Sequence, residues 1–521
     1  MEKTNGGIVF GDALNTDEII FAPKAQKIQI PVCDKTVTTE ISEDFTLPDY
    51  LTEIRRLLRI TPSIPAPSRY IGNDLAEFSG NILWSVLYVG GDGNLANANL
   101  SSAYEASADF DDGVECDPES NFEALDEISP ESIVGRVTAP RKLNIRCRLN
   151  HRIRAFGERT VETQIYGDCS SDSIKKLTYT LPACRMVCAV DDSLELEDSF
   201  TLGEGARIIT MQSDVIVNDT KCDNGEIICR GNVNLKMMAY TGDGDMTITE
   251  RKIPFTANPF AELDGDGWSC RAWGKVAHSY SETNGSDAVC RLNVCIVCEA
   301  QKNLPTQITT DIFSTESECD AIHETISVPC AMLCSSFRLN HDGSATIEGL
   351  PEGASVIDSG CTAEAESITL ENGKYILKGK CRYNVLYKGN NEYSARESEF
   401  PFSCELCDGS VEPTGFSADL TLTGCKVKPE GENMAYSAEI TAAVRIWANS
   451  EIDAICESNF GSEITPRTAA FTVAYPSSND TLWDVAKRYS VDPVELASAN
   501  GIRYKSPADP SSLDGVKYLV V

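Results

Sequence analysis

The segment Phe78-Ser-Gly-Asn-Ile-Leu-Trp-Ser-Val-Leu-Tyr88 occurs in three variants along the chain, and its pattern decides the fold class. The second variant is Cys229-Arg-Gly-Asn-Val-Asn-Leu-Lys-Met-Met-Ala-Tyr240, and the third is Leu377-Lys-Gly-Lys-Cys-Arg-Tyr-Asn-Val-Leu-Tyr387. Each has strand character, with a glycine near its start and a tyrosine at its end. The period of about 150 residues indicates domain duplication rather than a solenoid.

The spacing around this segment is repeated as well. A proline precedes the glycine by 49, 49 and 50 residues in the pairs Pro31 and Gly80, Pro182 and Gly231, and Pro329 and Gly379. Gly/Asp-rich turns and a second strand-like run follow each segment, which predicts β-hairpins and hence a sandwich-like β-domain. We expect a mainly β protein with three tandem β-sandwich-like repeats over residues 1–165, 166–311 and 312–462.

The last 54 residues, 468–521, instead predict a small βααβ module. Leu482, Val485, Ala486 and Tyr489 recur at i, i+3, i+4 and i+7, the period of one helix face, and Asp480 is the expected cap of this helix. A second helix is indicated by a capping residue, a proline and a glutamate in sequence, followed by a terminating glycine, namely Asp492, Pro493, Glu495 and Gly501. The flanking runs 471–475 and 516–521 have strand character.

This module resembles the LysM family, on the run Asp480-Thr-Leu-Trp483 with Leu496 and Asn500. The resemblance implies two helices packed on a two-stranded sheet, with a site for N-acetylglucosamine-containing glycans between the loop that enters the first helix and the loop that leaves the second. Both loops depart from the family pattern, at Asn479 and at Asp514-Gly515.

The candidate partner- or glycan-binding residues therefore lie on the two loops and the first helix: Asn479, Asp480, Thr481, Leu482, Trp483, Asn500, Ile502 and Tyr504. For Leu482 and Trp483 a plain core position is an open alternative, and for Asp480 a helix cap. Tyr504 is the expected contact anchor, because tyrosine and tryptophan dominate binding hot spots.

The first repeat alone contains Leu47-Pro-Asp-Tyr-Leu-Thr-Glu-Ile-Arg-Arg-Leu-Leu-Arg59, which we interpret as a short helix after Pro48. This run resembles the signature of the SPOCS domain, formerly the uncharacterised DUF3794 family. Three such units before one LysM module resemble the layout of the SipL-type clostridial spore coat morphogenetic proteins. That resemblance implies a protein of the mother-cell cytoplasm, recruited to the forespore surface, whose LysM module contacts the coat morphogenetic ATPase.

The formal charge of −34, from 45 basic and 79 acidic residues, argues against nucleic acid and anionic membranes as partners. No apolar segment near Met1 indicates a secretory signal, and no apolar run is long enough to span a membrane. We therefore expect the 21 cysteines to act as small buried apolar residues rather than as a disulfide framework, with later oxidative cross-linking as an alternative. The pairs Cys295/Cys298 and Cys404/Cys407 would point to opposite strand faces, so no metal site is predicted.

No catalytic motif, phosphate loop or metal-ligand spacing is present, so we expect a protein that is not an enzyme and needs no cofactor. Three functional hypotheses follow: a spore-assembly protein that docks through its C-terminal module, a peptidoglycan-binding protein with β-domain spacers, and a wall hydrolase targeted by LysM. The third lacks any recognisable catalytic domain.

Overall fold

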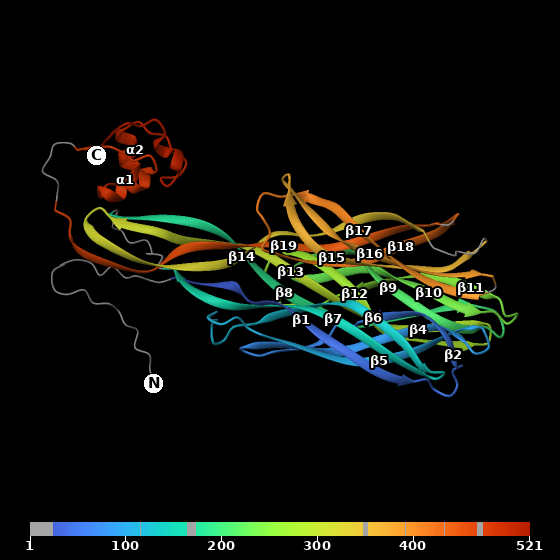
Figure 1. Ribbon diagram of the computed structural model, residues 1–521. Coiled ribbons are helices and arrows are strands. Elements are labelled where there is room, and N and C mark those ends of the chain that lie inside the picture. Colours follow the sequence, from blue (N-terminus) through green and yellow to red (C-terminus); the bar gives the residue numbers. More distant parts are fainter. Residues whose placement is uncertain are drawn as a thin grey trace, which may run out of the picture.

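The computed structural model describes residues 24–114, 116–163, 173–346, 353–390, 392–431, 433–465 and 472–521. The described chain is mainly β, as predicted, and its helices lie close to the C-terminus. Figure 1 shows an elongated body of long strands with a small helical module, coloured red, at one end. We call residues 24–163, 174–314 and 317–463 units 1, 2 and 3, and residues 472–521 the C-terminal module.

Each unit is built from two antiparallel sheets. The strands of unit 1 are β1 (Lys24–Thr46), β2 (Ile54–Ser63), β3 (Ser68–Ile71), β4 (Leu75–Gly90), β5 (Leu95–Asp109), β6 (Glu123–Ala139) and β7 (Lys142–Thr163). Those of unit 2 are β8 (Ile174–Thr201), β9 (Arg207–Asp223), β10 (Glu226–Tyr240), β11 (Met246–Ala257), β12 (Ser269–Asn284) and β13 (Asp287–Ser314). Those of unit 3 are β14 (Ser317–Thr346), β15 (Ser355–Glu371), β16 (Lys374–Gly389), β17 (Glu392–Asp408), β18 (Gly415–Glu430) and β19 (Asn433–Glu463).

The three units share one topology. The first strand of a unit pairs with its last strand, which also pairs with the strand before it, in the orders β1-β7-β6, β8-β13-β12 and β14-β19-β18. The intervening strands form the second sheet, in the orders β2-β4-β5, β9-β10-β11 and β15-β16-β17, and β3 adds to the first of these. The repeated sequence segment is thus the central strand of the second sheet in every unit.

The recurring glycine is explained by the aromatic residue on the neighbouring strand. Gly231 lies opposite Phe255, and a Cβ atom on Gly231 would be 2.7 Å from the Phe255 ring and 2.1 Å from the Ile216 carbonyl oxygen. The equivalent pairs are Gly80 with Tyr104 and Gly379 with Phe402. An aromatic ring that covers a strand glycine keeps the surface closed, which accounts for both members of each pair.

The predicted helix over 47–59 is wrong. Residues after Pro48 form a turn, in which the Leu51 N–H donates to the Pro48 carbonyl at 3.0 Å, and β2 begins at Ile54. The guanidinium of Arg141 donates to the Leu51 carbonyl at 3.0 Å and fixes this turn from a distant part of the chain. Pairing with β4 supplies the backbone hydrogen bonds that a helix would have made internally, so tertiary structure overrides the local pattern.

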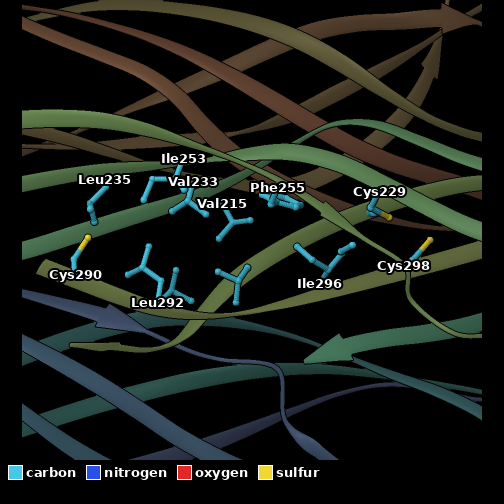
Figure 2. Packing of buried hydrophobic residues seen from close by; sticks show 14 of the residues in the cluster. Val215, Cys229, Val233, Leu235, Ile253, Phe255, Cys290, Leu292, Ile296 and Cys298 are labelled. Atoms are coloured by element: carbon cyan, nitrogen blue, oxygen red, sulfur yellow. The ribbon is translucent and has the colours of Figure 1, made fainter. Parts of the chain in front are cut away.

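The interior of unit 2 shows how the two sheets pack. Side chains from β10 and β11 on one side and β13 on the other form one buried cluster, drawn in Figure 2. Val233, Leu235 and Ile296 are all essentially inaccessible to solvent. The alternation of these residues along each strand puts every second side chain in the interior, which is the expected pattern of a sandwich.

The three units meet at a buried junction that contains one arginine from each: Arg154 of β7, Arg271 of β12 and Arg445 of β19. All three side chains are no more than 1% exposed. Two carboxylates neutralise most of their charge. Arg154 and Arg271 both pair with Glu127, at 2.8 and 3.3 Å, and Arg271 also pairs with Glu299 at 2.6 Å.

Every one of these arginines has a partner in another unit. Arg271 donates to the Ala443 carbonyl of unit 3 at 3.2 Å, and Arg445 donates to Gln301 of unit 2 at 3.1 Å. The guanidinium carbons of Arg154 and Arg445 both lie over the ring of Trp447, at 4.9 and 5.0 Å from its centroid. Such cation–π contacts stabilise guanidinium groups that have left water. We call Arg154, Arg271 and Arg445, together with the partners named above, the arginine junction.

The units meet a second time around Asp358 of unit 3. Its buried carboxylate pairs with Arg59 of unit 1 at 2.8 Å and with Lys236 of unit 2. Burial tends to raise the pKa of Asp358, but the two cations lower it below the ordinary value. An apolar cluster drawn from all three units contains Leu87, Met238 and Leu386, which precede the recurring tyrosine by one or two residues.

Replacing Gly231 with alanine should destabilise unit 2 by about 1–3 kcal/mol, because the new methyl group collides with a backbone carbonyl and a buried ring. Urea unfolding followed by tryptophan fluorescence measures this. Gly424→Ala is the matched control, since the nearest atom to its Cβ would be 3.7 Å away. Equal stabilities of the two variants would contradict the proposed role of the glycine.

The arginine junction makes stability depend on pH through Glu299. Burial tends to raise the pKa of Glu299, but Arg271, Arg445 and Arg154 lower it to about 2 from an ordinary 4.5. Its contribution is therefore present above about pH 4.5 and lost as the pH falls toward 2.

The unfolding free energies of the native chain and of Glu299→Gln should consequently converge by on the order of 3 kcal/mol between about pH 5 and about pH 2. Denaturant titrations at several pH values measure this difference. Glu195→Gln, at an exposed site, controls for the loss of one carboxylate. A difference that stays constant over this pH range would contradict the charge pairing in the junction.

Candidate functional site

The C-terminal module contains β20 (Val473–Ala474), α1 (Leu482–Arg488), α2 (Pro493–Ala499), the 3-10 turn η1 (Pro510–Leu513) and β21 (Leu519–Val520). The two short strands pair with each other in antiparallel fashion. This is the predicted βααβ arrangement, with strands shorter than the sequence pattern indicates.

Helix α1 begins with a cap other than the predicted one. The hydroxyl of Thr481 accepts the Asp484 N–H at 3.2 Å, and the Asp484 carboxylate accepts the Thr481 N–H at 2.8 Å, which completes a capping box. The prediction that Asp480 is the cap is wrong because Asp480 lies one residue too early. Its carboxylate instead pairs with Arg488 at 2.9 Å and ties the preceding turn to the end of the helix.

Helix α2 begins and ends as predicted. The Asp492 carboxylate accepts the N–H groups of Val494 and Glu495 at 2.6 and 3.1 Å, and Pro493 occupies the first helical position. Asn500 closes the helix, and Gly501 adopts a φ of 65°, the left-handed conformation that glycine tolerates best. These caps fix the positions of the loops on either side of each helix.

The eight candidate residues divide into structural and accessible groups. Leu482 and Trp483 are buried in the module core, so the core alternative holds for their location. Asn500 is also structural, because its amide donates to the carbonyls of Leu496 and Val520 at 2.8 Å and accepts the Val520 N–H at 2.7 Å. It thereby joins α2 to β21.

The remaining candidates lie closer to solvent. Asn479 is exposed, and Ile502 and Tyr504 are half-buried against the module core. Asp480 and Thr481 are half-buried and take part in the ion pair and the capping box described above. All eight candidate residues therefore lie on one small module. Asn479, Ile502 and Tyr504 take no part in the ion pair, the capping box or the Asn500 hydrogen bonds described above.

The two loops that flank the expected glycan groove are bridged by direct hydrogen bonds. The N–H of Trp483 donates to the Pro507 carbonyl at 2.8 Å, and the N–H of Leu482 donates to the Ser512 hydroxyl at 3.0 Å. These are first-turn N–H groups of α1, which have no partner within the helix. The long loop that follows α2 therefore folds back over the start of α1 and supplies their acceptors.

The C-terminal module is anchored to the end of unit 2. The indole N–H of Trp483 donates to Asp311 of β13 at 2.8 Å, and the ammonium of Lys487 pairs with the other oxygen of the same carboxylate at 2.6 Å. Phe313 packs edge-on against the Trp483 ring, with centroids 5.0 Å apart. Lys175 of β8 adds an ion pair with Asp492. In Figure 1 the module accordingly lies at the extended ends of β8 and β13.

Sequence reasoning missed this anchor. Asp311 is 172 residues from Trp483, and nothing in the local sequence distinguishes it from the many other surface carboxylates. A sequence feature that points to this anchor is Phe313, an apolar residue that follows the last strand-like run of the second repeat.

Comparison with known families agrees with the geometry of the module. Residues 477–508 match the family model described as LysM domain. Comparisons with curated proteins and with solved structures found no match for the chain. The match covers α1, α2 and the loops around them, but not the three units.

A second candidate site is the hollow between the three units. It has a volume of about 2350 Å³ and is lined by residues from all of them. Ten basic and nine acidic side chains line it, whereas the whole chain has 45 basic and 79 acidic residues, so its wall lacks the excess of acidic residues that the chain as a whole carries. No three His, Cys, Asp or Glu side chains of the described ranges are placed to hold a metal ion.

Within the part of the chain that the structure covers, we find no helix with the length and apolar character needed to cross a bilayer.

Asp311→Ala should loosen the C-terminal module, because it removes the acceptor of a buried indole N–H, a loss of about 1–3 kcal/mol. We expect amide hydrogen exchange in α1 to become at least about tenfold faster, measured by mass spectrometry of peptides that cover residues 482–488. Asp320→Ala, at an exposed position of β14, should leave α1 unchanged. Unaltered exchange in Asp311→Ala would show that the anchor does not hold the module.

Proposed function

We propose that this chain is a non-enzymatic assembly protein of the spore envelope, in which units 1–3 form a rigid body that presents the C-terminal module to a partner protein. In line with the layout of the chain, the proposed partner is the coat morphogenetic ATPase, and the proposed place is the forespore surface on its mother-cell side. The observation that carries the proposal is the pair of hydrogen bonds from Leu482 and Trp483 to the long loop.

These two hydrogen bonds affect which ligand the module can bind. A LysM domain is associated with peptidoglycan or related carbohydrate, held between the two loops. Here a carbonyl and a hydroxyl of the long loop already occupy the N–H groups of Trp483 and Leu482 at the start of α1. A sugar that needed those donors would have to displace an internal hydrogen bond. This cost favours a ligand that binds the outer surface of the C-terminal module instead.

The outer surface has features of a protein-docking face. Tyr475 and Tyr518, which adjoin the two short strands, are 73% and 58% exposed, and Val494 on α2 is 62% exposed. Tyrosines are frequent hot-spot residues because they supply contact area at low entropic cost. Tyr475 and Tyr518 are therefore aromatic side chains of the module that the units leave uncovered, and Tyr504 of the same module is half-buried.

A second candidate function is binding of peptidoglycan through the same module, with the units as spacers. The match of residues 477–508 to the LysM domain favours it. Co-sedimentation of the full chain with purified spore peptidoglycan decides between the two. Glycan binding predicts pelleting that free chitin oligosaccharide competes away, whereas protein docking predicts that the chain stays in the supernatant.

Tyr504→Ala should weaken binding of the full chain to the purified coat ATPase more than tenfold, because it removes an aromatic anchor at the edge of the module. Biolayer interferometry measures the affinity, and circular dichroism checks that the variant is folded. Tyr70→Ala, which removes a 63% exposed tyrosine from unit 1, is the matched control. An unchanged affinity of Tyr504→Ala would exclude this surface, and no binding by the native chain would exclude the partner.

A further inference from the structure

Three thiols gather in the interior of unit 2. Cys229 and Cys298 are completely buried within the apolar cluster, and Cys270 is partly exposed at its margin. Figure 2 shows the sulfur atoms of Cys229 and Cys298 at the same end of this cluster. All three are free thiols. Among the described residues, no three His, Cys, Asp or Glu side chains are placed here to hold a metal ion.

The strand register brings the three residues together. Cys298 lies opposite Ala272, so Cys270 is its diagonal neighbour on the adjoining strand and shares its face of the sheet. Cys229 comes from β10, in the opposing sheet of the same unit. Two of the thiols are therefore neighbours within one sheet, and the third faces them across the sandwich.

The thiols contact one another unequally. Cys298 lies within hydrogen-bonding reach of both Cys229 and Cys270. That contact lowers the pKa of Cys270 and of Cys229, while it raises the pKa of Cys298. Thiolates, rather than thiols, react with oxidants, so the partly exposed Cys270 is the reactive member.

We propose that Cys270, Cys298 and Cys229 form an oxidation relay, in which a peroxide that reaches Cys270 leads to a disulfide between the two sheets of unit 2.

The steps balance with hydrogen peroxide as the oxidant. The Cys270 thiolate attacks the O–O bond, which leaves a sulfenic acid on Cys270 and releases hydroxide. The sulfur of Cys298 then attacks the Cys270 sulfur, forms the first disulfide and expels the sulfenic oxygen as water. Overall two thiols lose two electrons and two protons, and the peroxide becomes two water molecules.

A thiol–disulfide exchange completes the relay without a further oxidant. The sulfur of Cys229 attacks the neighbouring Cys298 sulfur, Cys270 leaves, and the proton of Cys229 passes to Cys270. The resulting bond joins β10 to β13 across the core and regenerates Cys270. Oxidation at the margin is thereby converted into a cross-link inside the sandwich.

Unit 3 offers an internal comparison. Cys361 and Cys381 are buried and hydrogen-bonded to each other, but the nearby half-buried thiol, Cys425, has a pKa that burial raises. This pair lacks a partly exposed thiol that is easily deprotonated. We therefore expect the Cys361–Cys381 disulfide to form at least tenfold more slowly than the Cys229–Cys298 disulfide.

The test is a time course of the folded full chain in hydrogen peroxide, quenched with N-ethylmaleimide, digested without reduction and analysed by mass spectrometry. The peptide pair that contains Cys270 and Cys298 should appear first, and the pair that contains Cys229 and Cys298 should replace it. Cys270→Ser should slow the second cross-link at least tenfold. Cys116→Ser, which removes a half-buried thiol of unit 1 whose pKa burial raises, should not change its rate.

Cys270→Ala and the melting temperature of each variant separate loss of the relay from loss of the fold. The relay is excluded if the Cys229–Cys298 cross-link forms at the native rate in both Cys270 variants. It is also excluded if Cys270 is oxidised to sulfinic acid in the native chain while Cys298 remains unlinked.

Discussion

Three arginines buried at one point constrain the whole body of this protein. Removing a guanidinium from water has a large free-energy cost unless the charge is paired and its donors are satisfied. Here unit 1 supplies a carboxylate and unit 3 a backbone carbonyl to Arg271, and unit 2 supplies an amide to Arg445. Arg154 pairs with Glu127 of its own unit and lies over the Trp447 ring of unit 3. An isolated unit would leave its arginine without part of this environment, so we infer that the three units are stable only together.

Strand β13 connects this junction to the other features of interest. Cys298 and Glu299 adjoin on it, Gln301 follows, and Asp311 and Phe313 anchor the C-terminal module near its end. Between Glu299 and Asp311 the strand extends roughly 40 Å at about 3.3 Å per residue. A single strand therefore relates the position of the module to the junction, and in our proposal this gives the docking surface a fixed direction from the body.

The repeat made much of the fold predictable from sequence. The glycine, the tyrosine and the turn that recur in each repeat predicted the hairpins. The glycine reflects a local steric requirement, namely the space that the Phe255 ring takes above Gly231. The domain limits expected from the repeat stay a prediction. The prediction of a helix over residues 47–59 is wrong because the backbone of β2 pairs with β4 and the turn before it is held by Arg141. Both partners are distant in the sequence.

The site was only partly predictable, for the same reason. Helix periodicity and the Asp492 cap are local signals, and they located the module and its second helix correctly. Whether Trp483 lines a groove or fills a core depends on Asp311 and on Pro507, whose contacts with it require the folded structure. The arginines of the junction had no sequence signal, because an arginine in an alternating strand ordinarily points to solvent.

Native-state hydrogen exchange of the full chain in increasing denaturant tests the central claim, that the three units form one cooperative body. Amides of the central strands β7, β13 and β19 should converge on a single opening free energy and a single denaturant dependence. Three distinct opening free energies, with one unit exchanging while the others stay protected, would contradict the account.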